Sequence, residues 1–165
     1  MKLAGKFSLL LFLAALTVTT LSAQAKPPVK QAAAAVPEHA GYQSALSDLN
    51  AARAYLNYLG ANERIDVEET QAIDHIDKAM AKIKEIVKDE GLAGQSAPID
   101  TQLKRGDRYR RALELVDKAE RDCQHEKSDP RTNEMDHYAR YHLGLAHKLV
   151  QQAIDNTAKA ERGQR

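Results

Sequence analysis

Apolar residues recur along most of this chain at spacings of three and four, with polar and charged residues between them. This is the period of an α-helix that buries one face. The pattern predicts four helices, over about 38–59, 66–91, 101–126 and 129–161. No stretch of useful length alternates between apolar and polar residues, so we expect an all-α protein without a β-sheet.

Local signals mark where these helices begin and end. Asp66, followed three residues later by Glu69, has the pattern of a capping box at a helix start. Asp129 before Pro130 predicts the start of the last helix, because Asp caps well and Pro fits the first turn. Gly60 is expected to end the first helix as a C-cap.

The first two helices share their pattern with the last two at a constant offset of 67 residues. The matched positions are Tyr42, Ala45, Leu46, Leu49, Ala52, Ala72, His75, Ile76, Ala79 and Ile83 in the first copy, and Tyr109, Ala112, Leu113, Val116, Ala119, Ala139, His142, Leu143, Ala146 and Val150 in the second. A single offset across both helices indicates a duplicated helical hairpin, with repeat one over 38–91 and repeat two over 105–161. The connections predict an up-down-up-down four-helix bundle over 38–161, with the second and fourth helices parallel and diagonal.

The N-terminal residues have the order of a signal peptide. In 1–25, two lysines precede a short apolar run, and Ala23 and Ala25 then flank a cleavage point of the small-x-small type. The alternative is a membrane anchor, but the run is shorter than the roughly 20 residues that a spanning helix needs. Residues 26–37 hold three prolines and predict a flexible linker. We therefore expect an exported protein, periplasmic or secreted, with no stable membrane anchor after processing.

Charge and composition exclude some classes of partner. The chain has 24 Lys and Arg against 23 Asp and Glu, so its charge is close to balanced. Nucleic-acid and anionic-lipid partners need a concentrated basic face, so we expect neither. The sequence does not predict an oligomeric state.

The single cysteine, Cys123, cannot form a disulfide within the chain. At the repeat offset it aligns with Leu56, which predicts a small buried apolar residue. A reactive thiol is the alternative, and it would need exposure and a lowered pKa.

His75 and His142 are the most specific candidate site, because they occupy the same position of the two repeats. The predicted bundle places both imidazoles in one layer of the core, level with alanines of the other helices. Such a layer is able to bind a transition metal or to ligate haem b axially. The alternative is a pair of structural imidazoles, since metal sites usually have three or four converging ligands.

We find no catalytic constellation and do not expect an enzyme. The sequence has no Gly-x-Ser-x-Gly turn, no Gly-rich phosphate loop and no Cys-x-x-Cys-His haem attachment. The helical spacing Glu134-x-x-His137 is found in di-iron bundles, but those bundles need it twice, and repeat one has Thr70 in place of His137.

Four tyrosines form a candidate surface for a protein partner. Tyr55 and Tyr58 lie near the end of the first helix, and Tyr138 and Tyr141 lie near the start of the last. We expect antiparallel packing to bring the two pairs to one end of the bundle, where aromatic residues favour protein contacts. The alternative is ordinary boundary tyrosines with hydroxyls in water.

Three segments resemble a group of exported bacterial helical-bundle proteins of unknown function. They are YQSALSDLNAAR at 42–53, AIDHIDKA at 72–79 and RALELVDKA at 111–119, and the resemblance extends over about 39–154. It implies a four-helix bundle in the bacterial envelope or outside the cell, and it carries no catalytic residue. We therefore predict a non-catalytic binding or structural role with a protein partner in the envelope. A metal- or haem-binding bundle is the alternative.

Overall fold

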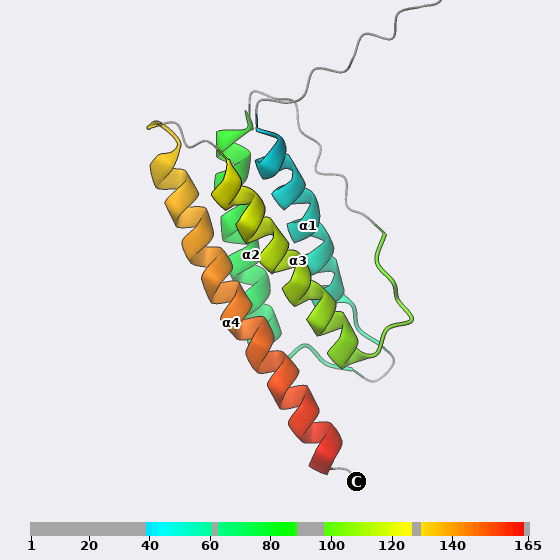
Figure 1. The fold of residues 1–165 in the computed structure, drawn as a ribbon. Coiled ribbons are helices and arrows are strands. Elements are labelled where there is room, and N and C mark those ends of the chain that lie inside the picture. Colours follow the sequence, from blue (N-terminus) through cyan, green and yellow to red (C-terminus); the bar gives the residue numbers. More distant parts are fainter. Residues whose placement is uncertain (1–38, 61–62, 89–97, 127–129, 164–165) are drawn as a thin grey trace, which may run out of the picture. The chain divides into compact units, whose positions relative to one another are not determined.

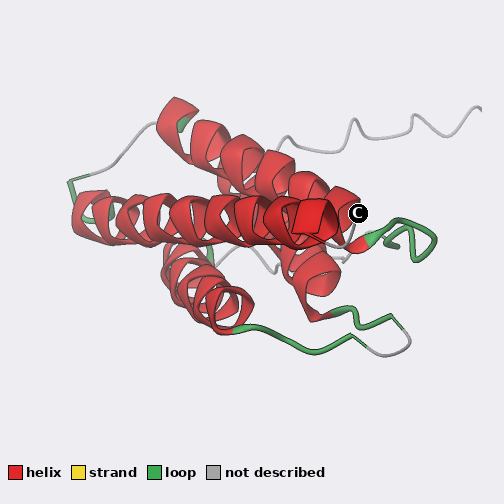
Figure 2. Ribbon diagram, turned by 90° about the horizontal axis from the view of Figure 1, so that it is seen from below, coloured by secondary structure: helices red, strands yellow, loops and turns green. Residues whose placement is uncertain are grey.

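The computed structural model describes residues 39–60, 63–88, 98–126 and 130–163. This part of the chain contains four α-helices and no strand (Figures 1 and 2). The helices are α1 (Ala40–Asn57), α2 (Val67–Ile86), α3 (Arg105–His125) and α4 (Asn133–Gly163). The all-α, four-helix prediction is confirmed. The predicted signal peptide, 1–25, and the linker, 26–37, lie outside the described residues.

The helix boundaries confirm one of the three local signals. The Asp66 amide donates to the Glu69 carboxylate at 2.6 Å, and the Asp66 side chain accepts from the Glu69 backbone, so the capping box is present. Gly60 is not the C-cap of α1, because the helix already ends at Asn57 and the Gly60 amide bonds the side chain of Glu63. The last helix starts after a turn at 130–132, later than predicted.

Side-chain contacts show that α1 and α3 are antiparallel neighbours. Lys118, in the second half of α3, binds Asp48 in the first half of α1, with Nζ to Oδ2 at 2.5 Å. Arg108, in the first turn of α3, donates to the carbonyl of Tyr58 just after α1. The start of each helix therefore lies beside the end of the other.

The helices α2 and α4 are also antiparallel neighbours. His75 of α2 contacts His142 of α4, whereas Glu68, near the start of α2, accepts a hydrogen bond from Asn156, near the end of α4. As the position along α2 falls, the position of its contact on α4 rises. This orientation contradicts our expectation that the two helices run parallel across a diagonal.

The resulting order is up-down-down-up, because α2 and α3 point the same way and α1 and α4 point the opposite way (Figure 1). The helices that pack together are α1 with α3, α3 with α4, α4 with α2 and α2 with α1. The up-down-up-down prediction was wrong. It took the connection between the repeats as a short-to-medium link over 92–100, whereas α2 ends at Ile86 and α3 begins at Arg105. The longer link permits a crossover along the bundle, as in other bundles with one long connection.

The core contains the residues that the repeat predicted. All the matched positions are buried except His75 and Leu113, which are half-buried. Tyr42 and Tyr109 are the largest of the fully buried side chains.

No helix in the described part of the chain is both long and apolar enough to span a membrane.

Contacts between the two helix pairs also come in matched sets. Tyr42 of α1 donates to Asp136 of α4, and Tyr109 of α3 donates to Glu69 of α2. The two tyrosines differ by 67 positions, and so do the two carboxylates. Each helix pair therefore supplies one tyrosine donor and one carboxylate acceptor to the other pair.

Candidate functional site

The structure brings His75 and His142 together on the seam between α2 and α4. Their Nδ1 atoms are 2.7 Å apart, with the ring centroids separated by 4.9 Å and the planes inclined by 28°, so the rings meet head-on through these nitrogens. The residues meet because antiparallel neighbouring helices cross there, rather than because parallel helices face each other across the core.

Two tyrosines of α4 cover this pair from the outside. The Tyr138 ring lies edge-on to His142 at a centroid distance of 4.4 Å, and the Tyr141 ring does so at 5.3 Å. His142 is 6% exposed, whereas Tyr138 and Tyr141 are 43% and 64% exposed. We call His75, His142, Tyr138 and Tyr141 the histidine–tyrosine face.

The surroundings keep the His142 imidazole neutral at neutral pH. Burial lowers the pKa of His142 below its ordinary value, and the nearby His75 and Lys78 lower it further, against an opposing effect of Asp74. Lys78 and Asp74 form an ion pair at 2.6 Å beside the site. A neutral imidazole keeps a nitrogen lone pair that can accept a proton or bind a metal.

The arrangement fits a small ion better than a haem group. Haem iron takes two axial histidines on opposite faces of the porphyrin, which then lies between the rings. The Nδ1 atoms of His75 and His142 are in direct contact at 2.7 Å, so a porphyrin between the rings would have to force α2 and α4 apart. Among the described residues, no group of three or more His, Cys, Asp and Glu side chains converges as a metal cluster. The pair therefore supplies two ligands, and solvent would supply the others.

The two tyrosine pairs lie at opposite ends of the bundle, so the prediction that they share an end was wrong. Tyr55 is buried, and its hydroxyl accepts a hydrogen bond from the amide of Asp100 at 3.1 Å. The guanidinium of Arg108 lies 5.1 Å from the centre of the Tyr58 ring. Since α1 and α4 point the same way, the end of α1 is far from the start of α4 (Figure 1). The error followed from the wrong topology.

Sequence reasoning missed a buried polar cluster around Glu69. This carboxylate is 2% exposed, and it accepts hydrogen bonds from the Tyr109 hydroxyl and from Arg105 at 2.8 Å. Burial raises the pKa of Tyr109, and the hydrogen bond to Glu69 raises it further, so the phenol remains a donor. The cluster is closed and satisfied, which is typical of a structural role.

The matching cluster lies at the other end of the bundle. Asp136 is 4% exposed, accepts from Tyr42 at 3.2 Å and pairs with Arg140 at 2.9 Å. Its position, 67 residues after Glu69, was a signal available in the sequence. An acidic residue at the same core position of both repeats indicates a buried carboxylate with a partner.

Cys123 is buried in the core, as its alignment with Leu56 predicted, with 2% of its surface exposed. Burial raises the pKa of the Cys123 thiol to about 12. Its thiolate fraction at pH 8 is then on the order of a thousandfold below that of a free cysteine with a pKa of about 8.5. We expect Ellman's reagent to label the native protein at least about a hundredfold more slowly than the guanidinium-unfolded protein. Equal labelling rates would contradict this burial.

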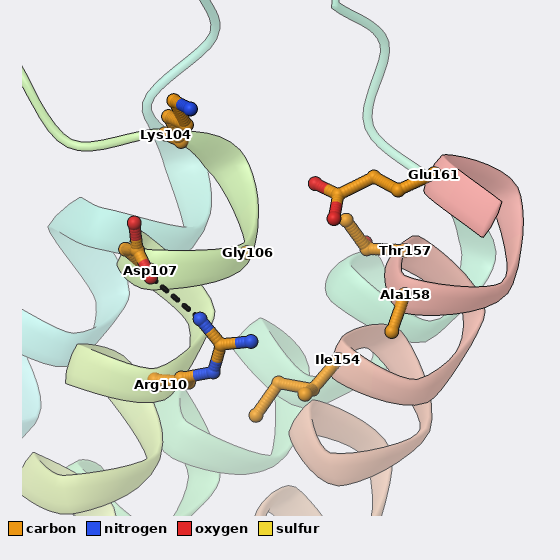
Figure 3. A pocket seen from close by; sticks show the side chains of 8 residues that line it. All are labelled: Lys104, Gly106, Asp107, Arg110, Ile154, Thr157, Ala158 and Glu161. Atoms are coloured by element: carbon orange, nitrogen blue, oxygen red, sulfur yellow. Dashed lines mark hydrogen bonds and ion pairs between the residues drawn. The ribbon is translucent and has the colours of Figure 1, made fainter. Parts of the chain in front are cut away.

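A groove of about 520 Å³ opens between the first turn of α3 and the last turns of α4 (Figure 3). It is lined by Lys104, Gly106, Asp107, Arg110, Ile154, Thr157, Ala158 and Glu161. The charged side chains are exposed and of both signs, and Asp107 pairs with Arg110 at 2.5 Å. The groove therefore favours neither an anionic nor a cationic ligand.

Comparison with known proteins does not assign this site. The resemblance to exported bacterial helical proteins thus stays a prediction. The chain matches no protein-family model, no curated protein and no solved structure.

Proposed function

We propose that this chain is a non-catalytic, exported protein of the bacterial cell envelope and that it binds a protein partner through the histidine–tyrosine face. The observation that carries the proposal is the pair of exposed rings, Tyr138 and Tyr141, anchored on the buried His142. The order of residues in 1–25 supports export.

The geometry of this face suits protein recognition. Tyrosine is enriched among the residues that dominate binding energy, because its ring is large and its hydroxyl remains polar. The edge-on contacts of Tyr138 and Tyr141 with His142 restrict both rings before a partner arrives. Restriction in advance reduces the entropy lost on binding. Lys82, whose ammonium lies 5.7 Å from the centre of the Tyr138 ring, adds a polar rim.

We further propose that the two helix pairs are copies of one ancestral hairpin. The support is that Tyr42 of the first pair bonds Asp136 of the second, while Tyr109 of the second bonds Glu69 of the first. The two tyrosines, and likewise the two carboxylates, are separated by the 67 residues that relate the two halves of the sequence. A duplicated hairpin packed on itself about a two-fold axis would produce this exchange, since each copy offers the same donor and the same acceptor.

Photo-crosslinking in intact bacteria tests the partner surface. A photoreactive phenylalanine at position 141 is expected to give one discrete adduct in the envelope fraction. In a chain with Tyr138→Ser and a photoreactive residue at 141, we expect about a tenfold loss of that adduct, the effect of removing a residue at the centre of an interface.

The chain offers a matched control at the opposite end of the bundle. Leu59, Ile65 and Val67 are also exposed apolar residues, with Val67 67% exposed. A probe at Val67 is expected to give no such adduct, and Val67→Ser is expected to leave the adduct at position 141 unchanged. Equal crosslinking from positions 67 and 141, or an adduct that survives Tyr138→Ser, would refute this face as the partner site.

A further inference from the structure

We infer that His75 and His142 form a two-histidine site for a divalent transition metal that prefers tetragonal geometry, copper(II) above all. The site joins α2 to α4 through the two Nδ1 atoms. The inference goes beyond the proposed function, because metal binding by the isolated chain needs no partner.

The spacing of the two nitrogens favours this class of metal. The Nδ1 atoms are 2.7 Å apart. Two ligands at about 2.0 Å from a metal are about 2.8 Å apart when they subtend a right angle, as neighbours do in a tetragonal site. In a tetrahedral site they are about 3.3 Å apart. The centroid distance of 4.9 Å shows that the two rings meet head-on through Nδ1, so each imidazole has to turn before both lone pairs converge on one ion. After that turn, the separation of the two nitrogens needs little change to fit neighbouring positions of a tetragonal ion.

The protonation of the pair also allows metal binding. Imidazoles bind metals in the neutral form, and the contact of the two Nδ1 atoms needs at least one neutral ring, because two protonated rings would repel each other there. In the metal-free pair, one Nδ1–H donates to the other Nδ1. When a metal binds, that proton moves to Nε2 of its own ring, so both Nδ1 lone pairs face the ion and no proton has to leave the protein.

The surroundings leave room for the other ligands. His75 is half-buried, so water reaches the site from its side, while the Tyr138 ring covers His142 at 4.4 Å. The described residues provide no third His, Cys, Asp or Glu ligand in a cluster. Water molecules therefore complete the coordination, and copper(II) is favoured over nickel(II) and zinc(II) by the general order of affinities for nitrogen ligands.

Copper(II) titration of the full chain, purified without a histidine tag and treated with EDTA, tests the inference. We expect one equivalent to bind, with an electron paramagnetic resonance spectrum that shows coupling to two nitrogens. The chain has no Trp. Copper should therefore quench a tyrosine emission that includes Tyr138 and Tyr141, which lie against the site.

Matched histidine variants decide the assignment. His75→Gln and His142→Gln are each expected to weaken copper(II) binding by about tenfold or more, because each removes one of the two protein ligands. His137→Gln and His147→Gln, on the same helix as His142, are expected to leave binding within about twofold, since neither touches the pair.

Retention of the nitrogen-coupled spectrum in His75→Gln would overturn the site, and so would tighter binding of zinc(II) than of copper(II). His75 is half-buried, so His75→Gln is expected to keep the helical circular dichroism of the wild-type chain. If His142→Gln fails to fold, the copper affinity of His75→Gln alone tests the site. The titration uses isolated protein and the crosslinking uses whole cells. Failure of one proposal therefore leaves the other standing.

Discussion

Glu69→Ala is expected to lower the free energy of unfolding by about 2–4 kcal/mol, from the lost helix cap and from a buried hydroxyl left without its acceptor. The Glu69 carboxylate is 2% exposed and accepts bonds from the Tyr109 hydroxyl and the Arg105 guanidinium. It also accepts from the amide of Asp66 at the start of α2. Alanine leaves all three donors without this acceptor and removes the capping box. Urea unfolding followed by helical circular dichroism measures the change at a constant m-value.

Two neighbouring substitutions serve as controls for this loss. Glu68→Ala removes the adjacent carboxylate, which bonds Asn156 at the surface, and is expected to change stability by less than about 1 kcal/mol. Tyr109→Phe keeps the ring and the pair of Glu69 with Arg105, so it is expected to lower stability by about 1 kcal/mol. If Glu69→Ala lowers the free energy of unfolding no more than Glu68→Ala does, the Glu69 carboxylate is not held in a closed cluster.

The helices and the core could be predicted from the sequence because they depend on local chemistry. The spacing of apolar residues decides which face of each helix is buried, whatever the helix packs against. The capping box at Asp66 needs only the backbone of its own first turn, and it was predicted correctly. The burial of Cys123 followed from its alignment with Leu56, since both copies need an apolar side chain there.

The order of the helices could not be predicted in the same way. Each hairpin buries the same apolar helix faces whether the four helices are arranged in the up-down-up-down or the up-down-down-up order. The choice depends on the link of 87–104, which fits either a long loop or a crossover. A clue lay in Glu69 and Asp136, because each needs a buried donor, and the tyrosine of the opposite hairpin reaches it only in the observed order.

The sequence predicted the right residues for the candidate site but the wrong arrangement of their two helices. The repeat predicted that His75 and His142 share one layer, but it placed them on diagonal helices. The two residues meet because α2 and α4 are antiparallel neighbours that contact each other at these positions. Tyr138 and Tyr141 have no tyrosine counterparts at the offset of 67, because residues 71 and 74 of α2 are Gln and Asp.

Gly41→Ala is expected to lower the free energy of unfolding by about 1–3 kcal/mol, the usual effect of an added methyl group in a tightly packed place. A Cβ at position 41 would lie 2.8 Å from the carbonyl oxygen of Asp122 and 2.6 Å from Oε1 of Glu126. The Glu126 side chain can turn away only by giving up the hydrogen bond that it accepts from the Gly41 amide. The Asp122 carbonyl belongs to the backbone of α3, so α1 and α3 must move apart.

Gly144→Ala in α4 provides the matched control with the opposite sign. A Cβ at position 144 meets no atom within 4 Å. Alanine there is expected to raise the free energy of unfolding by about 0.5–1 kcal/mol, because glycine inside a helix loses more backbone freedom on folding. Urea unfolding of both variants compares the two sites directly. If Gly41→Ala also stabilised the protein, the first turn of α1 could not lie against the backbone of α3, and the antiparallel contact of these helices would end before that turn.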